Sequence, residues 1–171
     1  MALFRNIVLL IAVVLSLVAC DESSHKDTKI QNGVAYITLP PGYTKMSRDL
    51  LKTKFPHQTP SEGYGTADTT SSFVFTMTNN KVSEQGLSEL GEMMRIQFSD
   101  YDPIISDIVV DKKKTIMIKV TTPASDGMID NVMLFTSLGG KVFLASFNSM
   151  HGDKDRYYAN GEEALRSIKW N

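Results

Sequence analysis

Four apolar segments joined by short links, between residues 105 and 148, constrain the fold of this chain most strongly. Each segment is rich in strand-forming residues such as Val, Ile, Phe and Thr. The segments cover residues 105–110, 115–121, 129–137 and 142–148. The links are the lysine-containing stretch 111–114, the loop 123–127 and the pair Gly139-Gly140, which is typical of a hairpin turn. Strands joined this closely predict an antiparallel sheet.

The remaining patterns predict two further strands and three helices. Strand-forming residues occur at 34–39 and 72–78, and apolar residues recur at helical spacing over 46–55, 83–98 and about 153–168. Ser47 or Thr44 is placed to cap the first helix, which Pro56 ends, and Ser83 is placed to cap the second. The order β-α-β-α-β-β-β-β-α predicts an α+β fold, a mostly antiparallel sheet of about six strands covered by about three helices. We expect residues 34–171 to form one globular domain.

The first residues of the chain have the pattern of a secretory signal peptide. A short start with one positive charge, Arg5, precedes an apolar run at 7–18. As a helix this run would be about 18 Å long, too short for the roughly 30 Å core of a bilayer. We therefore expect residues 1–19 to be a cleaved signal peptide.

The end of this segment, Leu17-Val18-Ala19-Cys20, resembles the lipobox of bacterial lipoproteins. The resemblance implies cleavage before Cys20, acylation of its thiol and anchoring to a membrane through the acyl chains. Asp21 follows directly, which in enteric-type lipoproteins implies retention at the periplasmic side of the inner membrane, with the outer membrane as the alternative. Residues 20–33 are polar and aperiodic, and we expect a flexible tether that ends in a turn at Asn32-Gly33.

Charge and cysteine content exclude several classes of partner and cofactor. The chain has 18 basic and 19 acidic residues, so it has no field that would steer it onto nucleic acid. Cys20 is the only cysteine, so its acylation leaves no thiol for a disulfide or a zinc site. The lysines at 112–114 are interpreted as a solvated hairpin turn, with contact to lipid phosphates as the alternative. We expect no cofactor.

A larger pattern resembles the PsbP-like α-β-α sandwich superfamily, and within it small bacterial lipoproteins of the DcrB-like kind. The pattern consists of the anchor, YITLPPGY at 36–43, a helix ending in Phe55-Pro56, and DGMIDNVMLFTSLGGKVFLASFN at 126–148 before a last helix. This resemblance implies a non-enzymatic accessory module of the envelope that binds a protein partner. A variant is an accessory or immunity lipoprotein linked to type VI secretion, and the alternative from another class is a lipid-anchored cell-envelope hydrolase.

One cluster offers groups suited to catalysis or metal binding. Ser149 and His151 would serve as nucleophile and base in a hydrolase, but no G-x-S-x-G motif accompanies them. His151, Asp153 and Asp155 resemble the start of a calcium loop without its remaining ligands. We interpret the two aspartates as residues at the start of the last helix and expect neither a catalytic nor a metal site.

The long connection at 56–71 is the candidate partner-binding loop. It is rich in Pro, Gly, Ser and Thr, and connections of this length are often functional. His57 and Tyr64 lie in it, and we expect Tyr64 to be an exposed aromatic anchor; the alternative is a mobile loop without a binding role. The aromatic residues of the strands are expected to form the core of the sheet: Tyr36, Phe73, Phe75, Phe135, Phe143 and Phe147.

Overall fold

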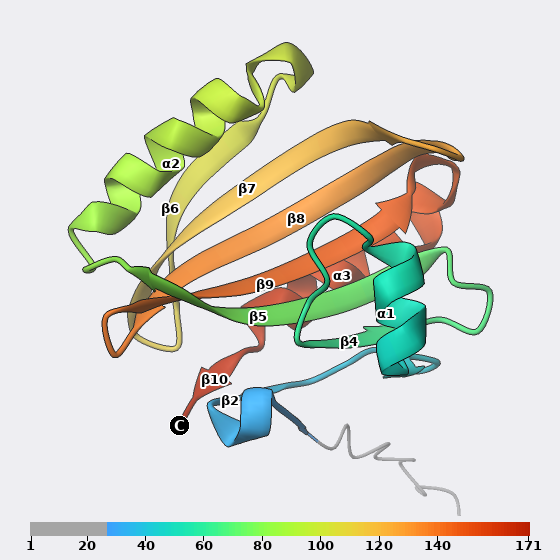
Figure 1. Cartoon of the computed structure of the whole chain (residues 1–171), viewed down its shortest axis with the longest axis horizontal. Helices are drawn as coiled ribbons and strands as arrows, with labels where there is room; N and C mark the ends of the chain where they lie inside the picture. The colour runs from blue at the N-terminus through green and yellow to red at the C-terminus, as the bar shows by residue number, and fades with distance from the viewer. Residues whose placement is uncertain (1–26) are drawn as a thin grey trace, which may run out of the picture.

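A seven-stranded antiparallel sheet is the main element of the computed structural model, which describes residues 27–171 (Figure 1). Its strand order is β3-β4-β5-β9-β8-β7-β6. The strands are β3 (Thr44–Lys45), β4 (Glu62–Gly65), β5 (Ser71–Lys81), β6 (Ile104–Val110), β7 (Lys113–Ala124), β8 (Gly127–Leu138) and β9 (Lys141–Met150). The α+β fold and the antiparallel sheet predicted from the sequence are therefore confirmed.

The meander from β6 to β9 forms as predicted, and its turns are tighter than expected. Asp111 and Lys112 both have positive φ angles, 41° and 67°, and so do Gly139 and Gly140, 57° and 77°. Two successive positive φ angles match the right-handed twist of the flanking strands. The predicted loop 123–127 is shorter in the structure, because Ala124 pairs with Gly127 and only residues 125 and 126 remain between the strands.

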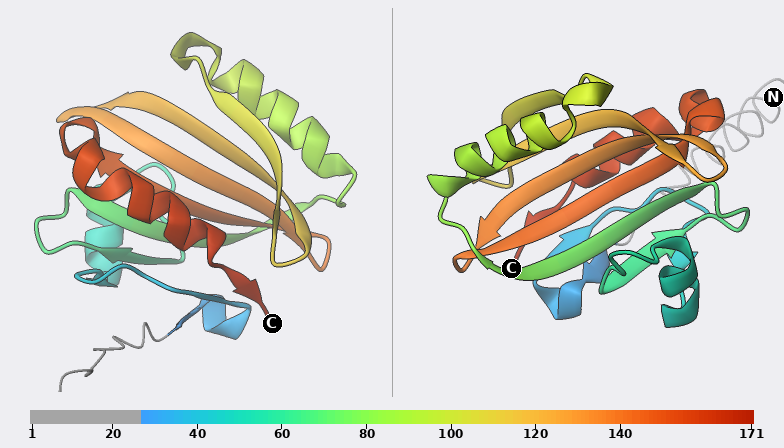
Figure 2. Two further views of the ribbon diagram at one scale, coloured as in Figure 1. Left: turned by 180° about the vertical axis from the view of Figure 1, so that it is seen from behind. Right: turned by 45° about the horizontal axis from the view of Figure 1, so that its top comes forward.

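Helices cover both faces of this sheet (Figures 1 and 2). In residues 27–171 they are α1 (Arg48–Lys54), α2 (Gly86–Gln97) and α3 (Lys154–Arg166), with single turns η1 (Gln31–Gly33), η2 (Ser99–Tyr101) and η3 (His151–Asp153). On one face, Leu51 of α1 packs with Val74, and Leu87 of α2 packs with Ile116. On the opposite face, Leu165 of α3 belongs to the main core. No helix in this part of the chain is long and apolar enough to cross a membrane.

The predicted capping residues are confirmed for some of the helices only. The Ser47 hydroxyl accepts a hydrogen bond from the Leu50 N–H at 3.2 Å, so Ser47 caps α1 as predicted. The Ser83 hydroxyl accepts from the Gly86 N–H at 3.1 Å, although α2 itself begins at Gly86. Asp153 occupies the N-cap position of α3 without a capping hydrogen bond from its side chain.

A second sheet, which the sequence did not predict, lies on the same side as α3. Its order is β1-β2-β10, from β1 (Thr28–Ile30), β2 (Ala35–Ile37) and β10 (Lys169–Trp170). Ile30, Ala35 and Ile37 are buried in the main core. The expected tether at 20–33 is thus wrong for residues 28–33, because Ile30 finds a place in the core and β1 pairs with β2. The turn at Asn32-Gly33 is confirmed, since both residues have positive φ.

The expectations for residues 1–19, Cys20 and Asp21 lie outside the described residues. The predicted aromatic core is confirmed for the four phenylalanines of β5 and β9, which are all fully buried: Phe73, Phe75, Phe143 and Phe147. Phe135 is also buried, whereas Tyr36 is half-buried. The rings of Phe73 and Phe147 stack across the two strands with centroids 5.0 Å apart.

α3 approaches the sheet closely at Gly161, which generates a prediction. A Cβ at this position would lie 2.4 Å from the ring of Phe147, which is fully buried and cannot move aside. We expect Gly161→Ala to lower the free energy of unfolding by about 1–3 kcal/mol through overpacking. This cost exceeds the roughly 0.5–1 kcal/mol that alanine gains over glycine within a helix. Urea unfolding of the two chains measures the difference.

Gly152→Ala is the matched control, because no atom lies within 4 Å of the added Cβ and its φ is not in the left-handed region. Equal stability of Gly161→Ala and the unmodified chain would contradict the packing of α3 described here.

Candidate functional site

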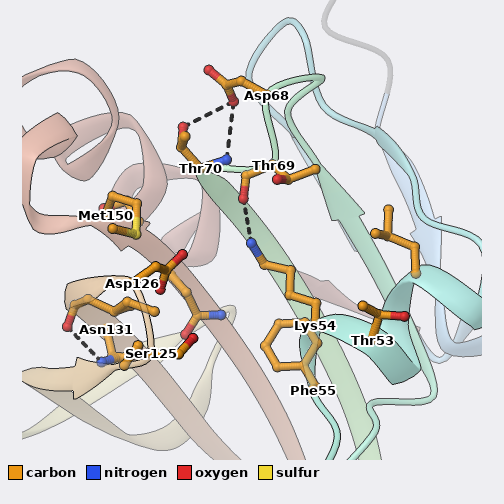
Figure 3. Close-up of a pocket in the computed structure, with 15 residues that line it drawn as sticks. Thr53, Lys54, Phe55, Asp68, Thr69, Thr70, Ser125, Asp126, Asn131 and Met150 are labelled. Carbon is orange, nitrogen blue, oxygen red and sulfur yellow. Dashed lines mark hydrogen bonds between the residues drawn. The ribbon is translucent and has the colours of Figure 1, made fainter.

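A hollow lies on the α1/α2 face of the large sheet, where two cavities of about 590 and 380 Å³ adjoin. We call the two cavities together the groove. Both are lined by Lys54, Phe55, Asn131 and Asn148. The larger cavity is further lined by Leu50, Thr53, Asp68, Thr69, Thr70, Ala124, Ser125, Asp126, Ile129, Ser149 and Met150 (Figure 3). The smaller is further lined by Pro56, His57, Gln58, Pro60, Val74, Thr76, Met133, Leu144 and Ser146.

The middle strands of the sheet provide amide groups to the groove. Asn131 of β8 and Asn148 of β9 are directly opposite in register, and Ser72 of β5 lies opposite Asn148. Asn131 Nδ2 donates hydrogen bonds to the Val120 carbonyl at 3.2 Å and to the Thr122 hydroxyl at 3.0 Å. Asn148 Nδ2 and the Ser72 hydroxyl are buried without a hydrogen-bond partner. An unpaired buried donor is costly, so a group that reached Asn148 Nδ2 would supply the hydrogen bond that the chain itself does not.

The opposite wall is built by the end of α1. The cap at Phe55, whose N–H donates to the Leu51 carbonyl at 2.9 Å, ends the helix. The Lys54 ammonium donates to the carbonyl of Thr69, a residue with φ of 60° (Figure 3). Burial lowers the pKa of Lys54, and the negative charges of Asp126 and Asp68 oppose this shift only in part. A partly desolvated cation therefore lines both cavities, as does the apolar side chain of Phe55.

Asp68 holds the rim of the groove. Its Oδ1 accepts from the Thr66 hydroxyl at 2.6 Å, the Thr70 hydroxyl at 3.0 Å and the Thr70 N–H at 3.2 Å. These hydrogen bonds, chiefly that from Thr66, lower the pKa of Asp68 to about 2, and the nearby Arg156 adds to the shift. The carboxylate thus fixes the 66–70 turn.

The structure brings only one of the two predicted loop residues to the groove. His57 is exposed and lines the smaller cavity. Tyr64 is not an exposed anchor, because residues 62–65 form β4 and Tyr64 is only 8% exposed. The strand explains the error: Tyr64 pairs with Phe73 in register and its ring packs edge-on against Phe75, 6.2 Å between centroids.

The sequence also did not predict the buried carboxylate of Glu62 beside Tyr64. The Tyr64 hydroxyl donates to Glu62 Oε1 at 3.0 Å, Lys45 Nζ to the same oxygen at 2.8 Å, and the Gln31 N–H to Oε2 at 2.7 Å. Burial would raise the pKa of Glu62, but these donors outweigh burial and hold its pKa below the usual range. Glu62 thereby ties the small sheet to the edge of the large one.

Ser149 and His151 are not arranged as a nucleophile and its base. The Ser149 hydroxyl is buried on β9 and has no hydrogen-bond partner. Nδ1 of His151 lies 3.0 Å from Oδ2 of Asp130, a residue that is only 2% exposed and also accepts from the Thr121 hydroxyl at 2.6 Å. The sequence did not predict Asp130 as the partner of His151, because only the pairing of β8 with β9 places Asp130 opposite Ser149. Among residues 27–171, no three His, Cys, Asp or Glu side chains converge on a point suited to a metal ion.

Comparison with known proteins shows the fold. Neither protein-family models nor curated protein sequences give a match to this chain. Among solved structures, the PsbP protein CyanoP of Synechocystis sp. PCC 6803 is 8% identical with a TM-score of 0.59, over 85% of this chain and 92% of that one. LpqN of Mycobacterium tuberculosis, described as involved in cell envelope biogenesis, is 7% identical with a TM-score of 0.54, over 87% and 86%. The chain has the PsbP-like fold.

The Asp68 turn predicts a pH dependence of stability. Because the pKa of Asp68 is about 2 in the folded chain and near 4 when unfolded, the unfolded chain takes up the proton first. The stabilisation by this carboxylate is therefore present above about pH 4 and is lost as the pH falls towards 2. We expect Asp68→Asn to flatten the fall in unfolding free energy between pH 4 and 2, measured by urea unfolding at each pH.

Asp49→Asn is the control. Asp49 is an exposed carboxylate at the start of α1 and does not belong to the 66–70 turn that Asp68 fixes. If both variants followed the pH profile of the unmodified chain, the role given to Asp68 would be wrong.

Proposed function

We propose that this chain is a lipid-anchored, non-enzymatic binding module of the bacterial envelope, held at the periplasmic side of the inner membrane. The proposal of an anchor is supported by the sequence around Cys20, with its apolar run and the following Asp21. Two or more acyl chains give stable attachment, whereas a single chain gives only reversible binding. Within this proposal the chain is of the DcrB-like kind.

The observation that carries a binding function is the groove. It combines an unpaired amide donor at Asn148, the partly desolvated Lys54 and apolar walls from Phe55 and Met133. Polar groups from Lys54, Asn131 and Asn148 can orient a bound group, while Phe55, Met133 and Leu144 add apolar surface. An extended protein segment suits it, because its carbonyl groups would accept from Asn148 while alternate side chains meet the apolar walls.

The fold is compatible with a place in the envelope, but it identifies neither the location nor the partner. LpqN, which has a similar structure, is described as involved in cell envelope biogenesis. At 7% identity the likeness extends to the fold, so the envelope location of this chain rests on its own N-terminal sequence. The partner is proposed to be an envelope protein.

The anchor is tested at Cys20. We expect the unmodified chain, expressed in a bacterial host, to incorporate labelled palmitate and to shorten by the signal peptide. Cys20→Ser should do neither, because the serine hydroxyl does not replace the thiol in the acylation reaction. Ser24→Ala, which leaves the motif at 17–20 intact, is the control and should behave like the unmodified chain. Labelling of Cys20→Ser at the normal level would refute the anchor.

The groove is tested by filling it. Thr76 lies on β5, lines the smaller cavity and is half-buried, so Thr76→Trp adds bulk there without removing a packed side chain. We expect affinity capture of the full chain from envelope extract to enrich a defined protein, and Thr76→Trp to reduce this enrichment at least about tenfold, as for a lost hot spot. Ile96→Trp, at a 75% exposed position on α2, is the control and should retain the partner. Equal enrichment by both variants, with unchanged thermal unfolding, would place the partner elsewhere.

A further inference from the structure

The outer face of the three-stranded sheet carries a row of two lysines and a tyrosine. Lys29 of β1 and Lys169 of β10 both pair with Tyr36 of β2, so the three side chains lie side by side across the strands. The neighbouring residues Ala35 and Ile37 are fully buried, whereas both lysines are exposed and Tyr36 is half-buried. The row therefore lies on the solvent side of the sheet. We call it the Lys-Tyr-Lys row.

The chain outside the structure enters this same sheet. Asp27 directly precedes β1 and is fixed there, since its carboxylate accepts from the Thr38 hydroxyl at 2.8 Å and from Lys169 Nζ at 2.9 Å. From Cys20 to Asp27 the chain spans at most about 25 Å when fully extended. If Cys20 carries the anchor, as proposed above, the three-stranded sheet is the part of the domain held nearest to the bilayer. Figure 1 shows β2 and β10 on the side of the molecule away from α2.

The chemistry of the row matches a bilayer that contains anionic lipids. Tyrosine is favoured at the level of the headgroups, and lysines near the surface are attracted to anionic lipids. A third exposed lysine, Lys112, adjoins the sheet, because the Asp111 carboxylate in the same turn accepts from the Trp170 N–H at 2.9 Å. Asp27 and Asp111 adjoin the row and accept hydrogen bonds from Lys169 and from the backbone of β10, so the three lysines exceed these two carboxylates by one positive charge.

We propose that the Lys-Tyr-Lys row, with Lys112 beside it, is a docking surface for an anionic bilayer that orients the anchored domain. The inference rests on the proposed anchor, since a tether this short keeps the local concentration of lipid high enough for a weak contact to matter. Docking through this face places α3 and the small sheet towards the lipid. The groove, on the opposite face of the large sheet, then points away from the membrane, where a partner can reach it.

The test is amine labelling of the full chain on vesicles. The chain is purified from a bacterial host in detergent and reconstituted into vesicles of phosphatidylcholine alone or with phosphatidylglycerol, and acetylation of each lysine is measured by mass spectrometry. We expect Lys29 and Lys112 to be labelled at least about threefold more slowly on the anionic vesicles. Lys52, exposed on α1 across the large sheet, is the internal control and should react equally on both. High salt should abolish the difference.

Charge reversal on this face gives an independent test, in which the labelled lysine is not one of those replaced. Lys29→Glu with Lys112→Glu should remove the salt-sensitive protection of Lys169 on anionic vesicles, whereas Lys52→Glu should not. Flotation of the vesicles in a density gradient shows separately whether the chain is bound to them. If the chain floats with both kinds of vesicle but its lysines are labelled equally on both, the docking surface is wrong and the anchor is retained. A chain that floats with neither overturns the anchor and the docking surface together.

Discussion

Strands β5, β9, β8 and β7 carry large apolar side chains on both faces, so this sheet is stable only if both faces are covered. The face with Phe73, Phe143 and Phe147 is covered by α3 and the three-stranded sheet. The other face is covered at one side by α2, over Ile116 and Ile118, and at the other by α1, over Val74. These two helices do not cover the whole width of the sheet, and the groove lies beside α1 on a part of the face that α2 does not line. The candidate site therefore exists because the helices cover only part of one apolar face of the sheet.

Much of the fold was predictable from the sequence, because its longest elements have strong local signals. The meander from β6 to β9 is specified by alternating apolar residues and by turn residues such as Gly139-Gly140. The strands that were missed, β1, β3, β4 and β10, are two to four residues long. They form because partners distant in sequence hold them, as β4 is held by β5 and β10 by β2. A window of sequence this short contains no periodicity from which to infer them.

The candidate site was harder to predict than the fold, since it depends on register. Asn131 and Asn148 are ordinary polar residues of two strands until their pairing places them opposite each other in the groove. Asp130 becomes the partner of His151 for the same reason, whereas the sequence suggested Asp153 and Asp155, which are simply nearer along the chain. Tyr64 was assigned to a surface loop because its Pro- and Gly-rich neighbours obscure a four-residue strand. The composition of residues 56–71 predicted a loop, whereas the pairing of Tyr64 with Phe73 makes residues 62–65 a strand.

The pairing of β2 with β10 joins residues near the start of the described chain to its last ones. Lys169 and Trp170 pair with Tyr36 and Ala35, and the Asn171 N–H donates to the Val34 carbonyl at 3.1 Å. Such distant pairing closes late, after the entropy of a long loop has been overcome. Loss of β10 would therefore leave an open edge on β2, where unpaired backbone groups are exposed.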